Sequence, residues 1–324
     1  MVKRLRGRRT STEAAAVLFD RLHGRQTDRP ILQPPVNEHM RWPAEAIWQA
    51  VAPSLDGFTV EVLPQIASTN TELMRRFRGV AGAAPRPEPT LLVAEQQTAG
   101  RGRLGRHWHS QRGDSLTFSL GLALGPADWS GLSLVVGISL AESLDPGSGK
   151  CPLIGLKWPN DLWLGNPGAE RKLAGILVET ASWDDIRYAV IGIGINIRPV
   201  TLPVHSVALA APAPMPMGYL QEVSSQFDAP AALLRVVPPL VLALQAFEQF
   251  GFAPFQARFA RRDVLAGRLV ELSDGSNGAA HGAAENGALL VHTSTGMKEI
   301  TSSEVSVRPV NRDGGPPALG KRSC

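Results

Sequence analysis

Hydrophobic and polar positions along the chain change their period several times, and each change predicts a different element. Helices are predicted where apolar residues recur every three to four positions, over 44–55, 70–78 and 129–144. Strands are predicted in the apolar and β-branched runs 58–63, 90–94, 115–124, 152–158, 173–180 and 187–197. The intervening segments 159–172 and 181–185 are typical of turns, so the strands beside them should pair antiparallel. The pattern predicts an α+β fold, a mixed and largely antiparallel sheet with flanking helices.

The pattern changes in the C-terminal third of the chain. A loop rich in proline and alanine, 199–216, is long enough to suggest that it covers a ligand. The helical block 230–262 follows, and Pro238 and Pro239 should kink or divide it. After residue 263, apolar and polar residues alternate between glycine turns, which predicts a small antiparallel barrel of about 45 residues.

Composition and charge favour an ordinary globular protein. The 324 residues, 44% of them hydrophobic and 19% charged, suffice for two domains with a sizeable core. No apolar run approaches the ~20 residues of a membrane span, and the two cysteines, Cys151 and Cys324, suit a reducing cytoplasm. The net charge of +4 arises from residues 1–30, which carry a local +5, so the remainder sums to −1. We therefore expect a cytoplasmic protein whose folded part lacks the basic charge of nucleic-acid binders.

Residues 1–41 are interpreted as a basic extension that is expected to be disordered, or as an over-long start. Prolines at positions 30, 34 and 35 mark a linker. One amphipathic helix is the most that this stretch can form, whereas a helix-turn-helix DNA-binding domain needs two or three. No uninterrupted apolar stretch follows the arginines, so a signal peptide is not predicted.

The segment 94–110 contains a literal G-x-G-x-x-G, formed by Gly100, Gly102 and Gly105. A dinucleotide-binding turn would need a helix that opens at the last glycine, and no helical period follows it. The glycines instead alternate with three arginines, Arg101, Arg103 and Arg106. Glycines let a backbone close around a ligand, and guanidinium groups bind phosphate or carboxylate oxygens in pairs. This arginine–glycine loop (residues 100–108) therefore predicts an anion site, with a solvated basic surface loop as the alternative.

Two further motifs place charged groups at strand ends. The segment KWPND carries Lys157, Asn160 and Asp161. Asp161 is a candidate to hold Mg²⁺ or to orient an amine, although a Pro-Asn turn is the plainer alternative. Lys172 begins a strand made of residues typical of a core. Either it lies at the edge, with the aliphatic part of its side chain buried and its charge in water, or its charge points at a ligand.

The segment GIGIN adds small and polar groups. Gly192 and Gly194 have no side chains, so another group can approach the strand backbone closely. Asn196 adds a hydrogen-bond donor and an acceptor at the end of the strand. Two histidines, His107 and His109, are too few ligands for a metal site. Their spacing of two is explained by the alternation of side chains along an extended segment.

These motifs together offer several cations, one carboxylate and several amides, without an activated nucleophile. The sequence has no G-x-S-x-G, no H-E-x-x-H and no P-loop. A cation-rich pocket of this kind suits phosphoryl or nucleotidyl transfer, in which positioning and electrostatics supply most of the catalysis.

Five segments resemble the ordered motifs of bacterial biotin protein ligases. They are STNTEL from Ser68, AEQQTAGRGRLGRHW from Ala94, KWPNDL from Lys157, KLAGILVE from Lys172 and GIGINI from Gly192. The resemblance runs from about residue 42 to 310 and is closest to the form without an N-terminal DNA-binding domain. It implies a catalytic domain at 42–263 similar to class II aminoacyl-tRNA synthetases, an SH3-like barrel at 264–310 and a tail at 311–324.

The resemblance implies a two-step acyl transfer. ATP, with Mg²⁺, activates the biotin carboxylate as biotinyl-5′-AMP, and the adenylate then acylates one lysine of a biotin carboxyl carrier protein domain of acetyl-CoA carboxylase. A homodimer is left open, and neither specific DNA binding nor a membrane is expected.

The resemblance also assigns roles to residues. It implies catalytic roles for Lys172, Arg103 and Asp161. It implies biotin binding by Ser68, Thr69, Asn70, Gln97, Gly100, Arg101, Gly102, Arg103, Lys172 and Gly175. It implies ATP binding by Arg103, Arg106, Trp108, Lys157, Asn160, Asp161, Lys172, Asn196 and Tyr219, with Tyr219 the nearest equivalent of a tryptophan that stacks on adenine in some relatives.

Three other functions compete with this interpretation. A lipoate-protein ligase shares the fold and the adenylate chemistry, and incubation with each acid, ATP and a carrier domain would separate the two. A biotin-responsive transcriptional repressor predicts operator binding that persists at physiological salt. A nicotinamide oxidoreductase predicts NAD binding, which a thermal shift would detect.

Overall fold

The computed structural model describes residues 40–79, 88–145, 152–183, 185–199, 215–301 and 307–309. Contacts divide the chain into two units, Met1–Arg41 and Trp42–Cys324, and all the helices and strands below belong to the second. The predicted basic extension up to residue 39, most of the loop 199–216, the tail 311–324 and both cysteines lie outside the described residues.

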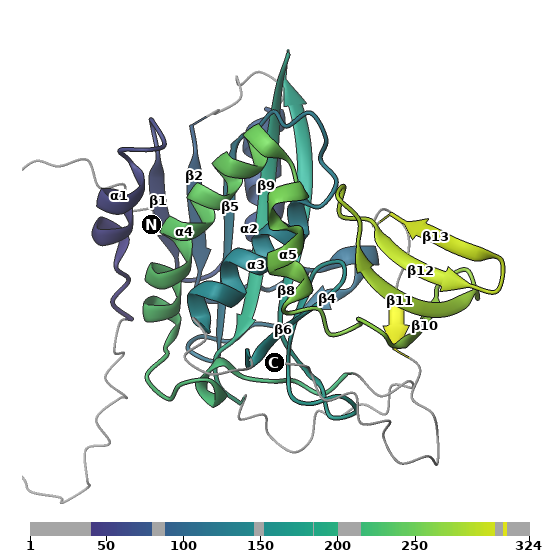
Figure 1. Ribbon diagram of the computed structural model, residues 1–324. Helices are drawn as coiled ribbons and strands as arrows, with labels where there is room; N and C mark the ends of the chain where they lie inside the picture. Colours follow the sequence, from purple (N-terminus) through teal and green to yellow (C-terminus); the bar gives the residue numbers. More distant parts are fainter. Residues whose placement is uncertain are drawn as a thin grey trace, which may run out of the picture. The chain divides into compact units, whose positions relative to one another are not determined.

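A seven-stranded mixed sheet has the order β1-β2-β5-β9-β8-β7-β6 (Figure 1). Its strands are β1 (Thr59–Leu63), β2 (Thr90–Ala94), β5 (Ser115–Ala123), β6 (Ile154–Lys157), β7 (Asp161–Leu164), β8 (Arg171–Trp183) and β9 (Ile186–Asn196). β1 and β2 pair parallel, and every other neighbouring pair is antiparallel. The predicted α+β fold with a mixed, largely antiparallel sheet is confirmed.

The sequence prediction of turns over 159–172 is wrong at β7. This strand has only four residues between the turn that ends at Asn160 and Gly165. A strand so short gives too few positions to show a period, so flanking turn residues dominate the sequence signal. β7 matters for the site because it pairs Asp161 with Lys157 on one side and with Gly175 on the other.

Helices cover the sheet on both sides. They are α1 (Ala44–Val51), α2 (Thr69–Arg78), α3 (Leu132–Leu144), α4 (Ala229–Phe250) and α5 (Gln256–Ala260), with single 3₁₀ turns η1 (Arg103–Gly105), η2 (Leu220–Glu222) and η3 (Ala253–Phe255). In Figure 1, α2 lies behind the sheet, and α3 and α4 lie in front of it. α2 buries Leu73 and Phe77, and the Phe77 ring stacks on Tyr188 of β9 at 4.9 Å between centroids. α2 is thereby fixed over β5, β8 and β9.

α4 differs from its prediction in two ways. It runs unbroken through Pro238 and Pro239, because its buried face packs against α3 and this packing outweighs the hydrogen bonds that the prolines remove. It is also the one helix of the described residues that is long and apolar enough to cross a membrane. In the sequence, charged residues such as Arg235 and Glu248 interrupt its apolar run, so the run looks shorter than the helix is. Half of that window is buried inside the protein, as in a core helix.

The C-terminal residues form a second, antiparallel sheet. Its strands are β10 (Leu269–Leu272), β11 (Asn277–Ala283), β12 (Leu289–Thr293), β13 (Gly296–Ile300) and β14 (Val307–Pro309), in the order β13-β12-β11-β10-β14. The buried Trp158 of KWPND donates its indole N–H to the carbonyl of Gly287 at 3.0 Å. Leu156 of β6 also bonds Arg262 and Val264. The second sheet therefore adjoins the edge of the first beside the KWPND motif.

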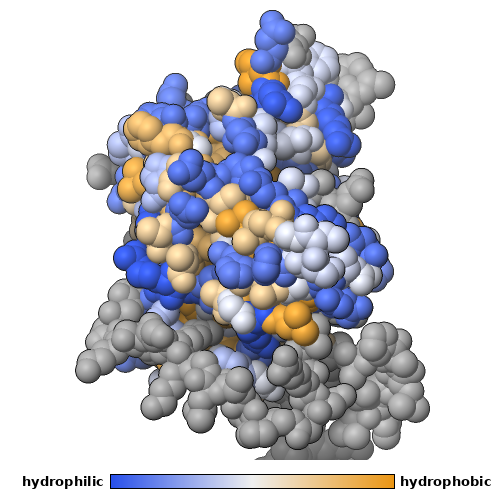
Figure 2. Space-filling model, turned by 45° about the vertical axis from the view of Figure 1, so that its right-hand side comes forward, coloured by the Kyte–Doolittle hydropathy of each residue, from blue (hydrophilic) through white to orange (hydrophobic). Residues whose placement is uncertain are grey.

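The molecular surface in Figure 2 carries hydrophobic residues in small separate groups among hydrophilic ones. Among the described residues of that face, no broad apolar patch is visible.

Candidate active site

The arginine–glycine loop folds as a small two-stranded ladder. β3 (Gly100–Arg101) and β4 (His107–Trp108) pair antiparallel around η1, and Gly102 donates its N–H to the carbonyl of Arg106 at 2.7 Å. Leu104 and Gly105 turn the chain with φ of 55° and 70°, a left-handed conformation that glycine adopts easily and leucine rarely. No α-helix opens at Gly105. The sequence argument against a dinucleotide-binding turn is therefore confirmed.

The arginine–glycine loop packs against glycines of the sheet, and we call Gly175 and Gly194 the seat of the loop. A Cβ at Gly194 would lie 2.3 Å from Cε2 of Trp108, and a Cβ at Gly175 would lie 3.5 Å from its Cζ3. At Gly192 the crowding group is the amide of Asn70, whose Oδ1 would be 2.1 Å from a Cβ. The groups that approach the glycines of β9 are thus side chains of the protein itself. They hold the loop and the start of α2 against β8 and β9.

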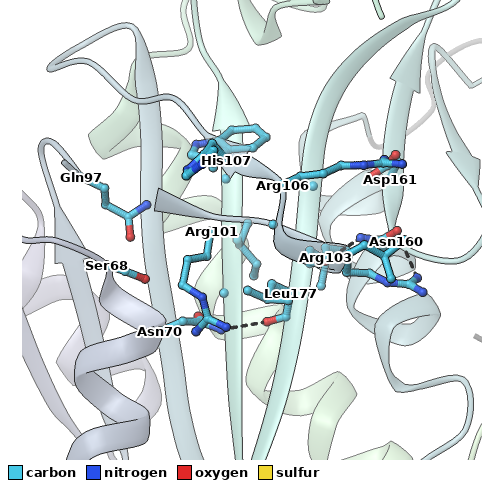
Figure 3. A pocket seen from close by; sticks show the side chains of 18 of the residues that line it. Ser68, Asn70, Gln97, Arg101, Arg103, Arg106, His107, Asn160, Asp161 and Leu177 are labelled. Atoms are coloured by element: carbon cyan, nitrogen blue, oxygen red, sulfur yellow. Dashed lines mark hydrogen bonds between the residues drawn. The ribbon is translucent and has the colours of Figure 1, made fainter. Parts of the chain in front are cut away.

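A pocket lies between the loop and the sheet (Figure 3). It contains about 900 Å³ of empty space, a volume that includes open solvent at its mouth. The structure brings together at its walls most of the residues that the sequence motifs single out. These are Ser68, Thr69, Asn70, Gln97, Arg101, Gly102, Arg103, Arg106, Trp108, Lys157, Asn160, Asp161, Lys172 and Gly175.

The two sides of the pocket differ in chemistry. In Figure 3, Ser68, Asn70 and Gln97 lie on one side of the loop, and Asn160 and Asp161 lie on the other. We call the first the neutral end (Ser68, Thr69, Asn70, Gln97 and Ser119) and the second the cationic end (Arg103, Arg106, Lys157, Asn160, Asp161 and Lys172). The pocket is also lined by the apolar residues Phe118, Ile176, Leu177 and Ile193, of which Leu177 shares a face of β8 with Gly175.

The neutral end is built from hydrogen bonds among its own residues. Gln97 Oε1 accepts from the N–H of Thr69 at 2.8 Å and from its hydroxyl at 3.1 Å. The hydroxyl of Ser119 lies 2.7 Å from Thr69 Oγ1 and 2.6 Å from Asn70 Oδ1, and its single hydrogen can serve one of them at a time. Ser68 caps α2 by accepting from the N–H of Thr71. Ser68, Thr69, Asn70 and Ser119 are buried and Gln97 is half-buried, and these hydrogen bonds set their orientations in the ligand-free protein.

Ser119, which supports two lining residues without lining the pocket itself, was missed by sequence reasoning. It is fully buried in β5, where its hydroxyl links two residues of the STNTEL motif. A signal was present in the sequence, because Thr117 and Ser119 interrupt an otherwise apolar strand at a spacing of two. Such a spacing places both polar side chains on one face of the sheet.

The cationic end gathers four basic side chains around one carboxylate. Lys172 Nζ lies 2.8 Å from Asp161 Oδ1, and Arg103 donates to Asn160 Oδ1 at 3.4 Å. Burial lowers the pKa of Lys157 to about 8, with further lowering by Lys172 and the two arginines and opposition from Asp161. Asp161 is the single acidic side chain among the described residues that line the pocket. The cationic end therefore carries an excess of positive charge that favours an anionic ligand.

The ends of β6, β7 and β8 position these charges. Lys157 and Asp161 face each other across the β6–β7 turn. The side-chain amide of Asn160 donates to the main-chain carbonyl of Ile176 at 2.7 Å. The main-chain carbonyl of Asn160 accepts from the N–H of Ile176 at 3.0 Å. Burial lowers the pKa of the Arg103 guanidinium, which nonetheless stays charged.

Three predicted site residues do not line the pocket in the described structure. Asn196 donates to the main-chain carbonyls of Lys172 at 3.0 Å and of Gly218 at 3.3 Å, so it supports Lys172 from behind. Gly100 is packed against the carbonyl of Trp108, which would be 2.3 Å from a Cβ. Tyr219 lies at the start of η2, where its N–H donates to Glu222 at 2.9 Å.

Comparison with known proteins places the chain in a family. A model of the biotin/lipoate A/B protein ligase family matches residues 62–196. The bifunctional ligase/repressor BirA of Escherichia coli (strain K12) is 38% identical over 267 residues, 80% of this chain and 77% of that protein. The chain belongs to this ligase family. A second family member, the biotin–[acetyl-CoA-carboxylase] ligase of Paracoccus denitrificans, is 30% identical over 75% of this chain and 98% of its own.

Solved structures of the ligase family agree with the fold. The biotin protein ligase from Aquifex aeolicus in complex with biotin and ATP superposes with a TM-score of 0.61 at 31% identity, covering 78% of this chain and 99% of that one. All residues of the neutral and cationic ends fall within 62–196, the range that matches the family model. The pocket is therefore built from the part of the chain that carries the family signature.

Proposed function

We propose that this family member is an ATP-dependent biotin protein ligase. It forms biotinyl-5′-AMP from biotin and ATP and transfers the biotinyl group to a lysine of a biotin carboxyl carrier protein domain of acetyl-CoA carboxylase. The observation that carries the proposal is the pairing of a neutral and a cationic end in one pocket. Biotin likewise joins a neutral urea ring to a carboxylate through an aliphatic chain.

The neutral end suits the urea group of biotin. That group has two N–H donors and one carbonyl acceptor, and the neutral end offers hydroxyl and amide groups of both kinds from Ser68, Thr69, Asn70 and Gln97. A lipoate head has no such groups and would form no hydrogen bonds with the neutral end. This argument favours biotin over lipoate as the acid.

The first chemical step joins two anions. A carboxylate oxygen of biotin attacks the α-phosphorus of ATP, the bond from that phosphorus to the oxygen bridging to the β-phosphate breaks, and pyrophosphate leaves with the electron pair. Lys172 and Arg103, assigned by us as catalytic, offset the repulsion between the reactants and the charge that develops on the phosphoryl oxygens. Arg106 and Lys157 are assigned to the phosphates, and Asn196 acts on them through its hold on Lys172.

The second step transfers the biotinyl group. The neutral amine of the carrier lysine attacks the acyl carbon of the adenylate, AMP leaves, and the amine loses a proton. Asp161 is our candidate for orienting that amine, because it is the acidic group among the described lining residues. Its carboxylate lies 2.8 Å from Lys172 Nζ, which holds it in place at the cationic end.

The residues of the pocket do not suit a resident metal ion. Asp161 alone supplies a carboxylate among the described lining residues, and Lys172 already pairs with it. Mg²⁺ takes one or two carboxylates together with phosphate oxygens and waters. In our proposal Mg²⁺ therefore enters with ATP as part of the substrate, and Asp161 offers at most one further ligand.

The same proposal covers domains, partners and location. We assign 42–263 to the catalytic domain and 264–310 to an SH3-like barrel, for which the five antiparallel strands β10–β14 are the support. Residues 1–41 and 311–324 are assigned to an extension and a tail. The enzyme is expected in the cytoplasm, alone or as a homodimer, with a carrier domain as partner and without specific DNA or a membrane. Stacking of adenine on Tyr219 stays a prediction.

The proposal is tested by mass spectrometry of a carrier domain incubated with the protein and ATP. With biotin we expect one biotinyl group on one lysine, and with lipoate no addition. Omission of ATP should abolish the transfer. A carrier that is modified by lipoate and not by biotin would overturn the choice of acid, and no modification by either would overturn the ligase.

A further inference from the structure

Glu179 belongs to none of the site residues that the sequence motifs single out, although it ends the KLAGILVE segment. It lies on β8 with 22% of its side chain exposed. Its carboxylate accepts a hydrogen bond from Asn70 Nδ2 at 3.0 Å and another from Arg101 Nη1 at 3.1 Å. The two donors come from different parts of the site, because Asn70 lies in α2 and Arg101 lies in the arginine–glycine loop.

Through Asn70 the carboxylate is connected to the hydrogen bonds of the neutral end. The amide of Asn70 also donates to the carbonyl of Leu177 at 3.2 Å, and its oxygen lies 2.6 Å from the hydroxyl of Ser119. Glu179 therefore helps to fix which way the Asn70 amide faces. In Figure 3 the side chains of Arg101 and Asn70 approach each other below the loop.

Through Arg101 the same carboxylate holds the loop. Arg101 is half exposed, with 48% of its side chain accessible, and its other described partner is the hydroxyl of Thr71 at 3.4 Å. A guanidinium so open to water stays in one place only where a charged acceptor fixes it, since charge-assisted bonds are about twice as strong as neutral ones. Glu179 is the acceptor in this position.

We infer that Glu179 is a positioning residue that ties the arginine–glycine loop to the neutral end. One carboxylate orders both the amide that shapes the neutral end and the arginine that keeps the loop closed. Closure of the loop and filling of the neutral end then stabilise each other, because linkage between two sites is reciprocal. The identity of biotin as the filling ligand rests on the proposed function; the tie between Glu179 and the loop does not.

The tie is tested first without any ligand. Trypsin cleaves after Arg101, Arg103 and Arg106, and the rate of cleavage there, followed by mass, reports the population of open loop. Glu179→Ala should raise that rate about five- to tenfold, and Glu179→Gln, which keeps an acceptor but loses the charge, should raise it by less. The matched control is Glu61→Gln, which breaks a glutamate–arginine pair of β1 and α2, Glu61 with Arg76, away from the loop.

Two results would overturn the inference. One is cleavage of Glu179→Ala at the wild-type rate. The other is equal acceleration by Glu61→Gln, which would mean that general loss of stability opens the loop. Because no substrate is present, these outcomes do not depend on whether the protein uses biotin.

The link to the neutral end is tested by steady-state kinetics. Glu179→Ala should raise KM for biotin about tenfold while changing kcat less than about twofold, because the loop closes normally once the pocket is saturated. Glu179→Gln should recover part of the loss. A fall in kcat with KM for biotin unchanged would contradict the positioning role. Absence of ligation in the wild-type protein would instead overturn the proposed function and leave the proteolysis result intact.

Discussion

The two ends of the pocket are constructed on opposite principles. At the neutral end the polar groups of Thr69, Asn70, Gln97 and Ser119 bond one another. At the cationic end four basic side chains surround Asp161, so most of their charge is left for a ligand. The polar groups of the neutral end are held by hydrogen bonds to one another, whereas the charges of the cationic end are only partly paired. Recognition and catalysis are thus assigned to separate parts of one pocket, and substitutions should separate them.

The largest effect is expected from Lys172→Ala. Loss of its ammonium removes a cation that stabilises the reacting anions, so the rate of biotinyl-5′-AMP formation should fall about 100- to 1000-fold. Radiolabelled adenylate measures this directly. Arg103→Ala should act in the same direction. The control is Lys298→Ala, which removes a surface lysine paired with Asp274 at 3.0 Å. Melting temperatures are measured alongside, because Asp161 loses its partner; adenylate at the wild-type yield would remove Lys172 from the mechanism.

The next largest effect concerns the seat of the loop between the two ends. Gly194→Ala places a methyl group where the Trp108 ring lies, 2.3 Å from Cε2, so the loop must lift. We expect ligation to fall about tenfold or more, with KM raised for both biotin and ATP, because the loop contributes to both ends. Gly125→Ala is the control, since its nearest side-chain atom is 3.8 Å away. A change in KM for one substrate alone would show that the loop serves a single end.

Thr69→Val tests the neutral end with a change of almost no volume. The hydroxyl that bonds Gln97 and Ser119 is lost, although Gln97 keeps the N–H of Thr69 and Ser119 keeps Asn70 as a partner. KM for biotin should rise about tenfold while KM for ATP stays constant, as expected for a cost of about 1.4 kcal/mol in one recognition site. Thr59→Val on β1, whose hydroxyl faces Thr90, serves as the control. An equal rise in both KM values would argue against the separation of the two ends.

The smallest effect should come from pH at the cationic end. Lys157 has its pKa lowered to about 8 by burial, so it is charged below this pH in the ligand-free protein and loses its charge as the pH rises. The value of kcat/KM for ATP should therefore fall about threefold between about pH 7.5 and about pH 8.5. Lys157→Arg should remove this dependence, because an arginine stays charged. A profile that is unchanged in the variant would assign the titration to another group.

Much of the fold could be predicted from the sequence because its signals are local. Alternation and β-branched runs identified the long strands, and the absence of a helical period after Gly105 excluded a dinucleotide turn. β7 could not be predicted, since four residues beside turn residues carry no period. The continuity of α4 through Pro238 and Pro239 could not be predicted either, because it depends on packing against α3.

The site divides in a similar way. The charged motifs indicated most of the cationic end, the resemblance to biotin protein ligases implied the neutral end, and the fold brings both into one pocket. Ser119 and Glu179 were missed because they bond other site residues rather than belong to a recognisable pattern of ligand-binding groups. Asn196 was assigned to the nucleotide, whereas its amide holds the main chain of Lys172. Such supporting contacts depend on the folded structure, and single-sequence patterns do not show them.

The central claim is that one pocket holds the urea of biotin at its neutral end and the phosphate of a nucleotide at its cationic end. Calorimetry with a non-hydrolysable analogue of biotinyl-5′-AMP tests it most directly, because this ligand spans both ends. The account predicts binding at least about 1000-fold tighter than biotin alone, with Thr69→Val and Lys172→Ala each weakening it. An analogue that binds no more tightly than biotin, or that is indifferent to one of the two substitutions, would contradict the claim.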